Sequence, residues 1–379
     1  MPMAPPPPVY DPADVTAAWL TEVLLAAGQL PGTSGTAGNA GGHGDTGRVV
    51  GFTTEPIGTG QVGANIRYRL AYEPATANDT APASVVAKFA AADEVSRAAG
   101  IATRTYETEV AFYRDLAATV DVSRPTCMFA AIEPGTADVV LILEDLAPAI
   151  QGDQIAGCTV EQARLAMDEA ARLHGPRWGD PTLLDHAWLA EAVAAGGTGV
   201  ADLYAFCWPG FVDRYRATLD EAALEVGARL EEGIRGWVAH PPPALTLTHG
   251  DYRLDNMLFA PASTDGRPLT VVDWQTVRLG CGTGDVAYFL GAGLDPPTRR
   301  AHEAGLVAHY HQALSAYDIA DYGFDACWED YRRYSFGGYV MAVIASVLVG
   351  RTERGDAMFM AMANRHAAQV TDLAALSVL

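Results

Sequence analysis

The sequence predicts an α+β fold with two lobes, an antiparallel β-sheet lobe at the N-terminus and a mainly helical lobe at the C-terminus. Between residues 48 and 146, short β-prone runs alternate with segments rich in Gly, Pro, Asn and Asp. Over residues 147–379, long segments with helical spacing of apolar residues dominate. There is no internal repeat, so the change of pattern near residue 146 indicates two different structural units.

Composition and charge exclude several classes of protein. The chain of 379 residues is 49% apolar and 19% charged, which is typical of a globular protein. Its 46 acidic and 25 basic residues give a net charge of −21, which disfavours binding to nucleic acid or anionic lipid. The five cysteines are spread without a C-x-x-C pair, which argues against a disulfide scaffold and a structural zinc site.

No basic, apolar leader segment is visible at the N-terminus, and the apolar stretch 339–350 is too short to span a bilayer. We therefore expect a cytoplasmic protein, a monomer or a homodimer, with no nucleic-acid or membrane partner. Residues 1–47 are predicted to form an N-terminal arm, a helix that begins at Asp11-Pro12, and a flexible Gly-rich loop over 31–47. This loop lacks the G-K-[ST] of a Walker-type phosphate loop.

Local patterns predict the elements of both lobes. In the N-terminal lobe (48–146), one helix over about 104–118 interrupts four strands, which are expected at 49–54, 66–72, 85–89 and 139–143. In the C-terminal lobe (147–379), a short strand-like region covers 245–273. Six helices are expected there, at 160–174, 188–195, 211–234, 298–316, 331–349 and 356–376.

The segment 245–273 carries the most informative polar residues. A loop with Asp251 and Asn256 separates two predicted strands, and the turn signal Asp265-Gly266 leads to a return strand that ends at Asp273. An antiparallel pair brings Asn256 and Asp273 to the same end of one hairpin, with Asp251 just upstream. Such oxygen donors suit Mg²⁺, and a further carboxylate can orient and deprotonate a hydroxyl. Each residue alone is also a common solvated turn former, but the combined order, spacing and hairpin favour a site.

The lysine count singles out one further position. The 25 basic residues are 24 Arg and a single lysine, Lys88, which lies in the predicted strand 85–89. In a chain so strongly biased toward Arg, the retained lysine marks a position where Arg does not serve. The alternative is an exposed strand lysine that survived by chance.

The order of Asp251, Asn256, the hairpin and Asp273 resembles the catalytic loop and metal-binding Asp of protein-kinase-like phosphotransferases. Several segments resemble the small-molecule branch, which includes aminoglycoside phosphotransferases, choline kinases and ecdysteroid-kinase-like proteins: His249-Gly250-Asp251, Val272-Asp273-Trp274-Gln275, 171–175 and 284–290. By this resemblance Asp285 is expected to be the N-cap of a helix. No A-P-E-like segment follows Asp273, which counts against a protein kinase.

The resemblance implies a bilobal protein-kinase-like fold whose N-terminal lobe binds ATP. It implies that Lys88 contacts the α- and β-phosphates and pairs with a helix glutamate; helical spacing favours Glu109 over Glu107. The other implied nucleotide contacts come from the glycine loop and the hinge between lobes: Gly60, Gly63, Glu144 and Leu146. An ordinary glycine-rich hairpin remains the alternative for that loop.

The resemblance further implies that Asn256 and Asp273 hold Mg²⁺ and that Asp251 is the catalytic residue, which positions the acceptor hydroxyl and takes its proton. The expected function is an ATP- and Mg²⁺-dependent kinase for a hydroxyl of a small molecule, favoured as a metabolic compound. The acceptor pocket is expected in the helical lobe. The alternatives are an antibiotic phosphotransferase, a nucleotide-binding pseudokinase regulator and a protein kinase.

Overall fold

The structure is a computed structural model, and it describes residues 4–30, 47–58, 63–73, 81–242, 244–261, 266–319 and 321–379. The chain divides into two units, which are described separately. The N-terminal unit comprises Met1–Asp115 and Pro125–Ala147, and the C-terminal unit comprises Leu116–Arg124 and Pro148–Leu379. The expected α+β fold is confirmed, with an antiparallel sheet in the first unit and many helices in the second.

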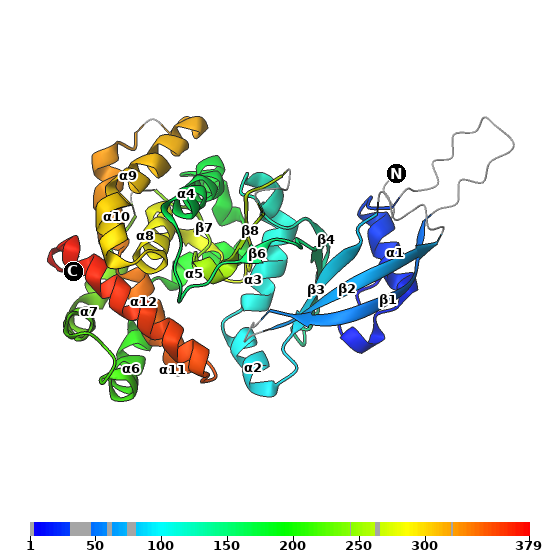
Figure 1. Cartoon of the computed structure of the whole chain (residues 1–379), viewed down its shortest axis with the longest axis horizontal. Helices are drawn as coiled ribbons and strands as arrows, with labels where there is room; N and C mark the ends of the chain where they lie inside the picture. Colours follow the sequence, from blue (N-terminus) through cyan, green and yellow to red (C-terminus); the bar gives the residue numbers. More distant parts are fainter. Residues whose placement is uncertain are drawn as a thin grey trace, which may run out of the picture. The chain divides into compact units, whose positions relative to one another are not determined.

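A five-stranded antiparallel sheet of order β1-β2-β3-β5-β4 is the centre of the N-terminal unit (Figure 1). Its strands are β1 (Arg48–Ile57), β2 (Gly63–Glu73), β3 (Ser84–Ala90), β4 (Cys127–Ile132) and β5 (Val139–Glu144). The helices are α1 (Ala17–Ala26), α2 (Glu94–Ala102) and α3 (Thr105–Ala111), with a short 3-10 turn at Pro12–Asp14 before α1.

The two faces of this sheet bury different helices, because successive side chains of a strand point to opposite faces. Val85, Ala87 and Phe89 of β3 pack in one apolar cluster with α1, where the ring of Trp19 lies edge-on to that of Phe129 at 5.5 Å. On the other face, Val139, Leu141 and Leu143 of β5 pack in a second cluster with Tyr106 and Val110 of α3. Lys88 alternates with Ala87 and Phe89, so it belongs to the face that α3 covers.

Three elements differ from the sequence prediction for this part of the chain. Strand β4 was not predicted, and the expected helix over 104–118 is α3 followed by a π-helical turn (Phe112–Leu116) and a 3-10 turn (Ala117–Thr119). Helix α2 was also not predicted. Its only buried residue is Gly100, so it shows no apolar stripe, and Asp93 caps it by accepting a hydrogen bond from Ser96 N at 2.8 Å.

Helices form most of the C-terminal unit (Figure 1). They are α4 (Val160–His174), α5 (Ala187–Ala195), α6 (Thr198–Tyr215), α7 (Glu221–Ala239), α8 (Gly282–Gly293), α9 (Pro296–Leu314), α10 (Phe324–Tyr334), α11 (Gly337–Leu348) and α12 (Glu353–Asp372). Short 3-10 turns lie at Gly175–Arg177, Pro181–Asp185, Leu254–Asn256, Ser315–Tyr317 and Ala375–Val378. Helices α6, α7, α8, α11 and α12 share one buried core that includes Tyr204, Phe211, Leu230, Tyr339 and Met362.

Two small antiparallel sheets complete this unit. One contains β6 (Ile150–Gln151), β8 (Met257–Phe259) and β9 (Leu269–Val271), and the other pairs β7 (Thr246–Thr248) with β10 (Arg278–Gly280). No helix in the described part of the chain is long and apolar enough to cross a membrane.

Two of the predicted long helices are each two helices. The pattern over 211–234 covers the end of α6 and most of α7, which are separated by Arg216–Asp220, with Asp220 as the N-cap of α7. The pattern over 331–349 likewise covers the end of α10 and all of α11. In the first case the apolar residues on each side pack into a common core, so the spacing continues across a break in the helix.

Candidate active site

A hairpin brings two of the predicted metal-binding residues together. Met257 of β8 pairs with Val271 of β9, and Val272 N donates to Asn256 O at 3.0 Å. Asn256 therefore lies beside the end of β9, and Asp273 directly follows Val272 in the chain. The hairpin geometry expected from the sequence is present, although residues 262–265 of its turn lie outside the described part of the chain.

The loop before Asn256 is anchored through its backbone. Gly250 has φ +80°, and a Cβ there would lie 2.5 Å from Thr276 O, so this position requires glycine. The carboxylate of Asp285 accepts hydrogen bonds from His249 N at 2.6 Å and Gly250 N at 3.0 Å. The expectation that Asp285 is a helix N-cap is wrong, because α8 begins at Gly282 and the carboxylate binds the backbone of His249 and Gly250 instead.

His249 joins this loop to the end of the hairpin. Its Nε2 lies 3.0 Å from Val272 O, and its Nδ1 accepts a hydrogen bond from Asp251 N at 3.3 Å. This pattern assigns the proton to Nε2. The imidazole also lies against the Trp274 ring, with centroids 4.9 Å apart. The two segments that carry Asp251 and Asp273 are thus tied to one another.

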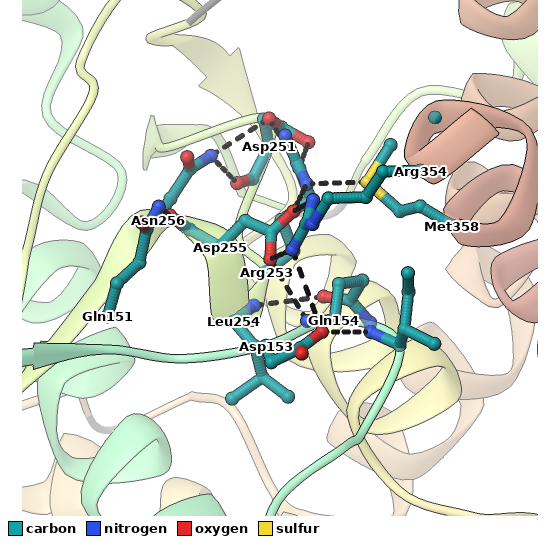
Figure 2. A network of polar contacts seen from close by, with 12 residues as sticks. Gln151, Asp153, Gln154, Asp251, Arg253, Leu254, Asp255, Asn256, Arg354 and Met358 are labelled. Atoms are coloured by element: carbon teal, nitrogen blue, oxygen red, sulfur yellow. Dashed lines mark hydrogen bonds and ion pairs between the residues drawn. The ribbon is translucent and has the colours of Figure 1, made fainter. Parts of the chain in front are cut away.

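Three side chains donate hydrogen bonds to the carboxylate of Asp251. Arg253 Nε lies 3.0 Å from Oδ1 and 2.9 Å from Oδ2, and Tyr288 OH donates to Oδ1 at 2.8 Å. Asn256 Nδ2 donates to Oδ2 and to the backbone oxygen of Asp251, both at 2.8 Å, as Figure 2 shows. The Asp251 side chain is 19% exposed, so it is accessible to a small molecule while held on several sides.

These donors also determine the charge state of Asp251. Burial alone would raise the pKa of this carboxyl, but the charge and hydrogen bonds of Arg253 and the hydroxyl of Tyr288 outweigh it, so the pKa lies below its usual value. The carboxylate is therefore ionised at neutral pH and is a weak base.

A chain of charges leads from Asp251 to the start of α12. Arg253 Nη1 donates to Asp255 Oδ2 at 2.8 Å, and Asp255 Oδ1 accepts from Gln154 N at 3.0 Å and from Arg354 Nη2 at 3.2 Å. Met358, one turn after Arg354 on α12, lies with its Sδ 3.2 Å from Arg253 Nη1 (Figure 2). Helix α12 thereby holds the guanidinium that contacts Asp251.

Asp273 and Asn256 offer oxygen atoms at the end of the hairpin. Asp273 has φ +69°, a conformation that is uncommon for a residue other than glycine and that is frequent at functional sites. Asn256 donates through Nδ2, so its Oδ1 is directed away from Asp251 (Figure 2). A carboxylate and an amide oxygen fit Mg²⁺, which completes its shell with water and phosphate. No cluster of three or more His, Cys, Asp or Glu side chains fit for a metal occurs among the described residues.

In the N-terminal unit, Lys88 forms a buried ion pair. Its Nζ lies 2.6 Å from Glu109 Oε2, and the two side chains are 12% and 4% exposed. Glu107, the other candidate, pairs with Arg104 at 2.6 Å on the surface. A Cβ on Gly63 would lie 3.6 Å from Lys88 Cε, so the start of β2 runs close to the lysine.

The remaining predicted nucleotide contacts have different surroundings. Gly60 lies outside the described residues. Glu144 ends β5, where its N donates to Thr126 O at 2.9 Å, and Leu146 follows after Asp145. The Asp145 carboxylate accepts from Arg67 Nε at 2.6 Å and from Ser84 Oγ at 2.5 Å, which fixes the backbone between Glu144 and Leu146.

Sequence reasoning did not identify Arg253, Tyr288, Asp255 or Arg354. Asp251, Arg253 and Asp255 alternate in charge at a spacing of two residues, and this alternation could have indicated an ion-pair network in the loop. Tyr288 and Arg354 approach from helices that are distant in sequence, and no local pattern indicates them.

Comparison with known proteins identifies the fold. Residues 185–320 match the model of the ecdysteroid kinase-like family, and no curated protein sequence matches the chain. The ethanolamine kinase of Plasmodium vivax aligns with a TM-score of 0.53 and 10% identity, over 86% of this chain and 83% of that one. The choline kinase of Cryptosporidium parvum Iowa II aligns with a TM-score of 0.50 and 12% identity, over 85% and 89%.

The GDP complex of the wild-type aminoglycoside 2'-phosphotransferase-IIIa aligns with a TM-score of 0.50 and 13% identity, over 84% of this chain and 94% of that one. The family model and these structures all belong to small-molecule kinases, which confirms the resemblance carried by the catalytic-loop motifs. The chain has the protein-kinase-like fold of the small-molecule kinases.

Proposed function

We propose that this protein is a Mg²⁺- and ATP-dependent kinase that transfers the γ-phosphate to a hydroxyl group of a small metabolic compound. The observation that carries the proposal is the Asp251 carboxylate, ionised, 19% exposed and held by Asn256, the residue that also leads into the hairpin to Asp273. Phosphoryl transfer needs a carboxylate that orients the hydroxyl nucleophile and, beside it, oxygen donors for the metal that binds the phosphates.

Asp251 is the catalytic residue of this proposal. A carboxylate with a lowered pKa accepts a hydrogen bond from the acceptor hydroxyl and orients its oxygen toward the phosphate. Because it is a weak base, it takes the proton late, after the bond to phosphorus has begun to form. This sequence suits the loose transition state of phosphoryl transfer, in which little proton abstraction is needed early.

Asn256 and Asp273 are the residues that would hold Mg²⁺. When bound, the metal neutralises charge on the phosphates. The left-handed backbone of Asp273 supports this role, because such strained residues persist where the surrounding structure requires them. Gln275 Nε2 donates to Asp273 Oδ2 at 3.2 Å and limits the rotation of the carboxylate.

The N-terminal unit supplies the nucleotide contacts. Lys88, fixed by Glu109, donates to the α- and β-phosphates, and Gly63, which lies close to Lys88 at the start of β2, contacts them. The hinge from Glu144 to Leu146 bonds the adenine edge. Since Glu144 N already donates to Thr126 O, the contact at Glu144 uses its carbonyl.

The test is ADP formation from Mg·ATP in the presence of a panel of amino alcohols, sugars, sterols and aminoglycosides, with product detection by phosphorus NMR. A parallel series with GTP measures the nucleotide preference. We expect acceptor-dependent ADP formation with at least one metabolic hydroxyl compound and a phosphate ester as product. Nucleotide binding without phosphate transfer to any acceptor would contradict the proposal and favour the pseudokinase regulator.

A further inference from the structure

A tyrosine from outside the catalytic loop contacts the reacting carboxylate. Tyr288 lies in α8, is 5% exposed, and donates its hydroxyl to Asp251 Oδ1 at 2.8 Å. Its ring packs in the core shared by α6, α7, α8, α11 and α12, and lies edge-on to His366 with centroids 5.7 Å apart. Because the ring is held by packing, the hydroxyl is held at a fixed point beside Asp251.

The hydrogen bonds of Asp251 fix the orientation of its carboxylate. Arg253 Nε bridges both oxygens, Asn256 Nδ2 donates to Oδ2, and Tyr288 OH donates to Oδ1. Arg253 and Asn256 belong to the same loop as Asp251, whereas Tyr288 reaches it from the packed helix α8. Without the Tyr288 hydroxyl, Oδ1 keeps the contact that it shares with Oδ2 but loses its own donor, and the carboxylate has more freedom to turn.

We propose that Tyr288 is a positioning residue, which holds the carboxylate of Asp251 in the orientation that accepts a hydrogen bond from the acceptor hydroxyl. The proposal rests on the proposed function, because it gives Tyr288 a part in the reaction of Asp251. The phenol remains protonated and able to donate, since burial and the charge of Asp251 raise the pKa of Tyr288 well above its usual value.

Removing only the tyrosine hydroxyl leaves the other contacts of Asp251 in place. These are the hydrogen bonds from Arg253 Nε to both oxygens, from Asn256 Nδ2 to Oδ2, and from the Asp251 N–H to His249 Nδ1. The loss of the Tyr288 hydroxyl therefore changes the restraint on the carboxylate and leaves the rest of the loop unchanged.

Tyr288→Phe removes the donor and keeps the ring. We expect kcat for phosphoryl transfer from Mg·ATP to water, the smallest hydroxyl acceptor, to fall about tenfold or more, while KM for Mg·ATP stays unchanged. The matched control is Tyr204→Phe, which removes a buried hydroxyl that donates to Gly227 O at 2.9 Å in the same core. It should cost similar stability and leave kcat unchanged.

Carbon NMR of ¹³C-labelled aspartate carboxyls at one fixed pH gives a readout that needs no turnover, with Asp251 identified by its loss in Asp251→Asn. The carboxyl chemical shift responds to hydrogen bonds, so we expect the Asp251 signal to move in Tyr288→Phe and to stay constant in Tyr204→Phe. An unmoved Asp251 signal in Tyr288→Phe, or an equal loss of kcat in both variants, would overturn the positioning role. If Tyr288→Phe moves the Asp251 signal but the wild-type protein transfers phosphate to no acceptor, the proposed function alone is overturned.

Discussion

Replacing Glu109 by Gln tests the buried ion pair of the N-terminal unit. Lys88 Nζ and Glu109 Oε2 are 2.6 Å apart, and the side chains are 12% and 4% exposed. Removing one charge from a buried pair costs about 3–5 kcal/mol. Because glutamine keeps the shape and still accepts a hydrogen bond, we expect the free energy of unfolding to fall by about 2–3 kcal/mol. For a unit of this size, the melting temperature should then fall by roughly 4–12 °C.

The same change should reduce activity, because Lys88 is no longer held in one direction toward the phosphates. We expect kcat/KM for Mg·ATP to fall by about 10- to 100-fold. Thermal unfolding and steady-state ADP formation measure the two effects. The matched control is Glu107→Gln on the same helix, which breaks the Glu107–Arg104 pair. Both of these side chains are about half exposed, and such surface pairs contribute about 0–1 kcal/mol, so kcat/KM should not change.

The two variants separate a specific role from a general effect of charge. Equal losses in Glu109→Gln and Glu107→Gln, in either stability or kcat/KM, would show that the buried Lys88–Glu109 pair has no specific role. A stable Glu109→Gln variant with wild-type kcat/KM would likewise show that Lys88 needs no carboxylate to bind phosphate.

Three further changes test other parts of the account. Gly250→Ala should lower the free energy of unfolding by about 2–4 kcal/mol in urea titrations, because of its φ of +80° and a Cβ 2.5 Å from Thr276 O. The control is Gly236→Ala in α7, where a Cβ meets nothing within 4 Å and should not destabilise the protein. Equal losses of stability in the two variants would contradict a specific need for glycine at 250. Asp273→Ala should raise the Mg²⁺ concentration for half-maximal turnover by about tenfold or more, and Asn256→Ala should raise it by less, since an amide carries no charge. An unchanged Mg²⁺ dependence in both variants would show that these two side chains do not bind the metal. Mg·ATP should slow labelling of Lys88 by an amine reagent but not of the N-terminal amine, as peptide mass spectrometry measures. Equal labelling rates with and without nucleotide would remove Lys88 from the nucleotide site.

Local patterns predicted much of the fold. The hairpin was predictable because its turn signal and both of its strands lie within 30 residues, and the α3 face was predictable from the spacing of Tyr106 and Val110. Strand β4 and helix α2 were missed, because β4 depends on pairing with β5 and α2 buries only one residue. The break before α7 was missed because α6 and α7 pack into one shared core.

Site residues that are close together in the sequence could also be predicted, whereas distant ones could not. Asp251, Asn256 and Asp273 lie in one short segment with a recognisable order, so the sequence could predict their proximity. The groups that set the properties of Asp251 come partly from far along the chain, since Tyr288 belongs to α8 and Arg354 to α12. Only the tertiary packing of those helices brings the groups together. The error for Asp285 has the same origin, because its backbone partners lie 35 and 36 residues away.

Asp251→Asn, assayed for both nucleotide binding and phosphoryl transfer, tests whether the Asp251 carboxylate takes the proton of the acceptor. Asparagine keeps the size of the side chain and removes its ability to take a proton. We expect Mg·ATP binding, measured by calorimetric titration, to survive, while transfer to water or to an identified acceptor falls by about 10²- to 10⁴-fold. Wild-type turnover in this variant would show that Asp251 is not the catalytic residue.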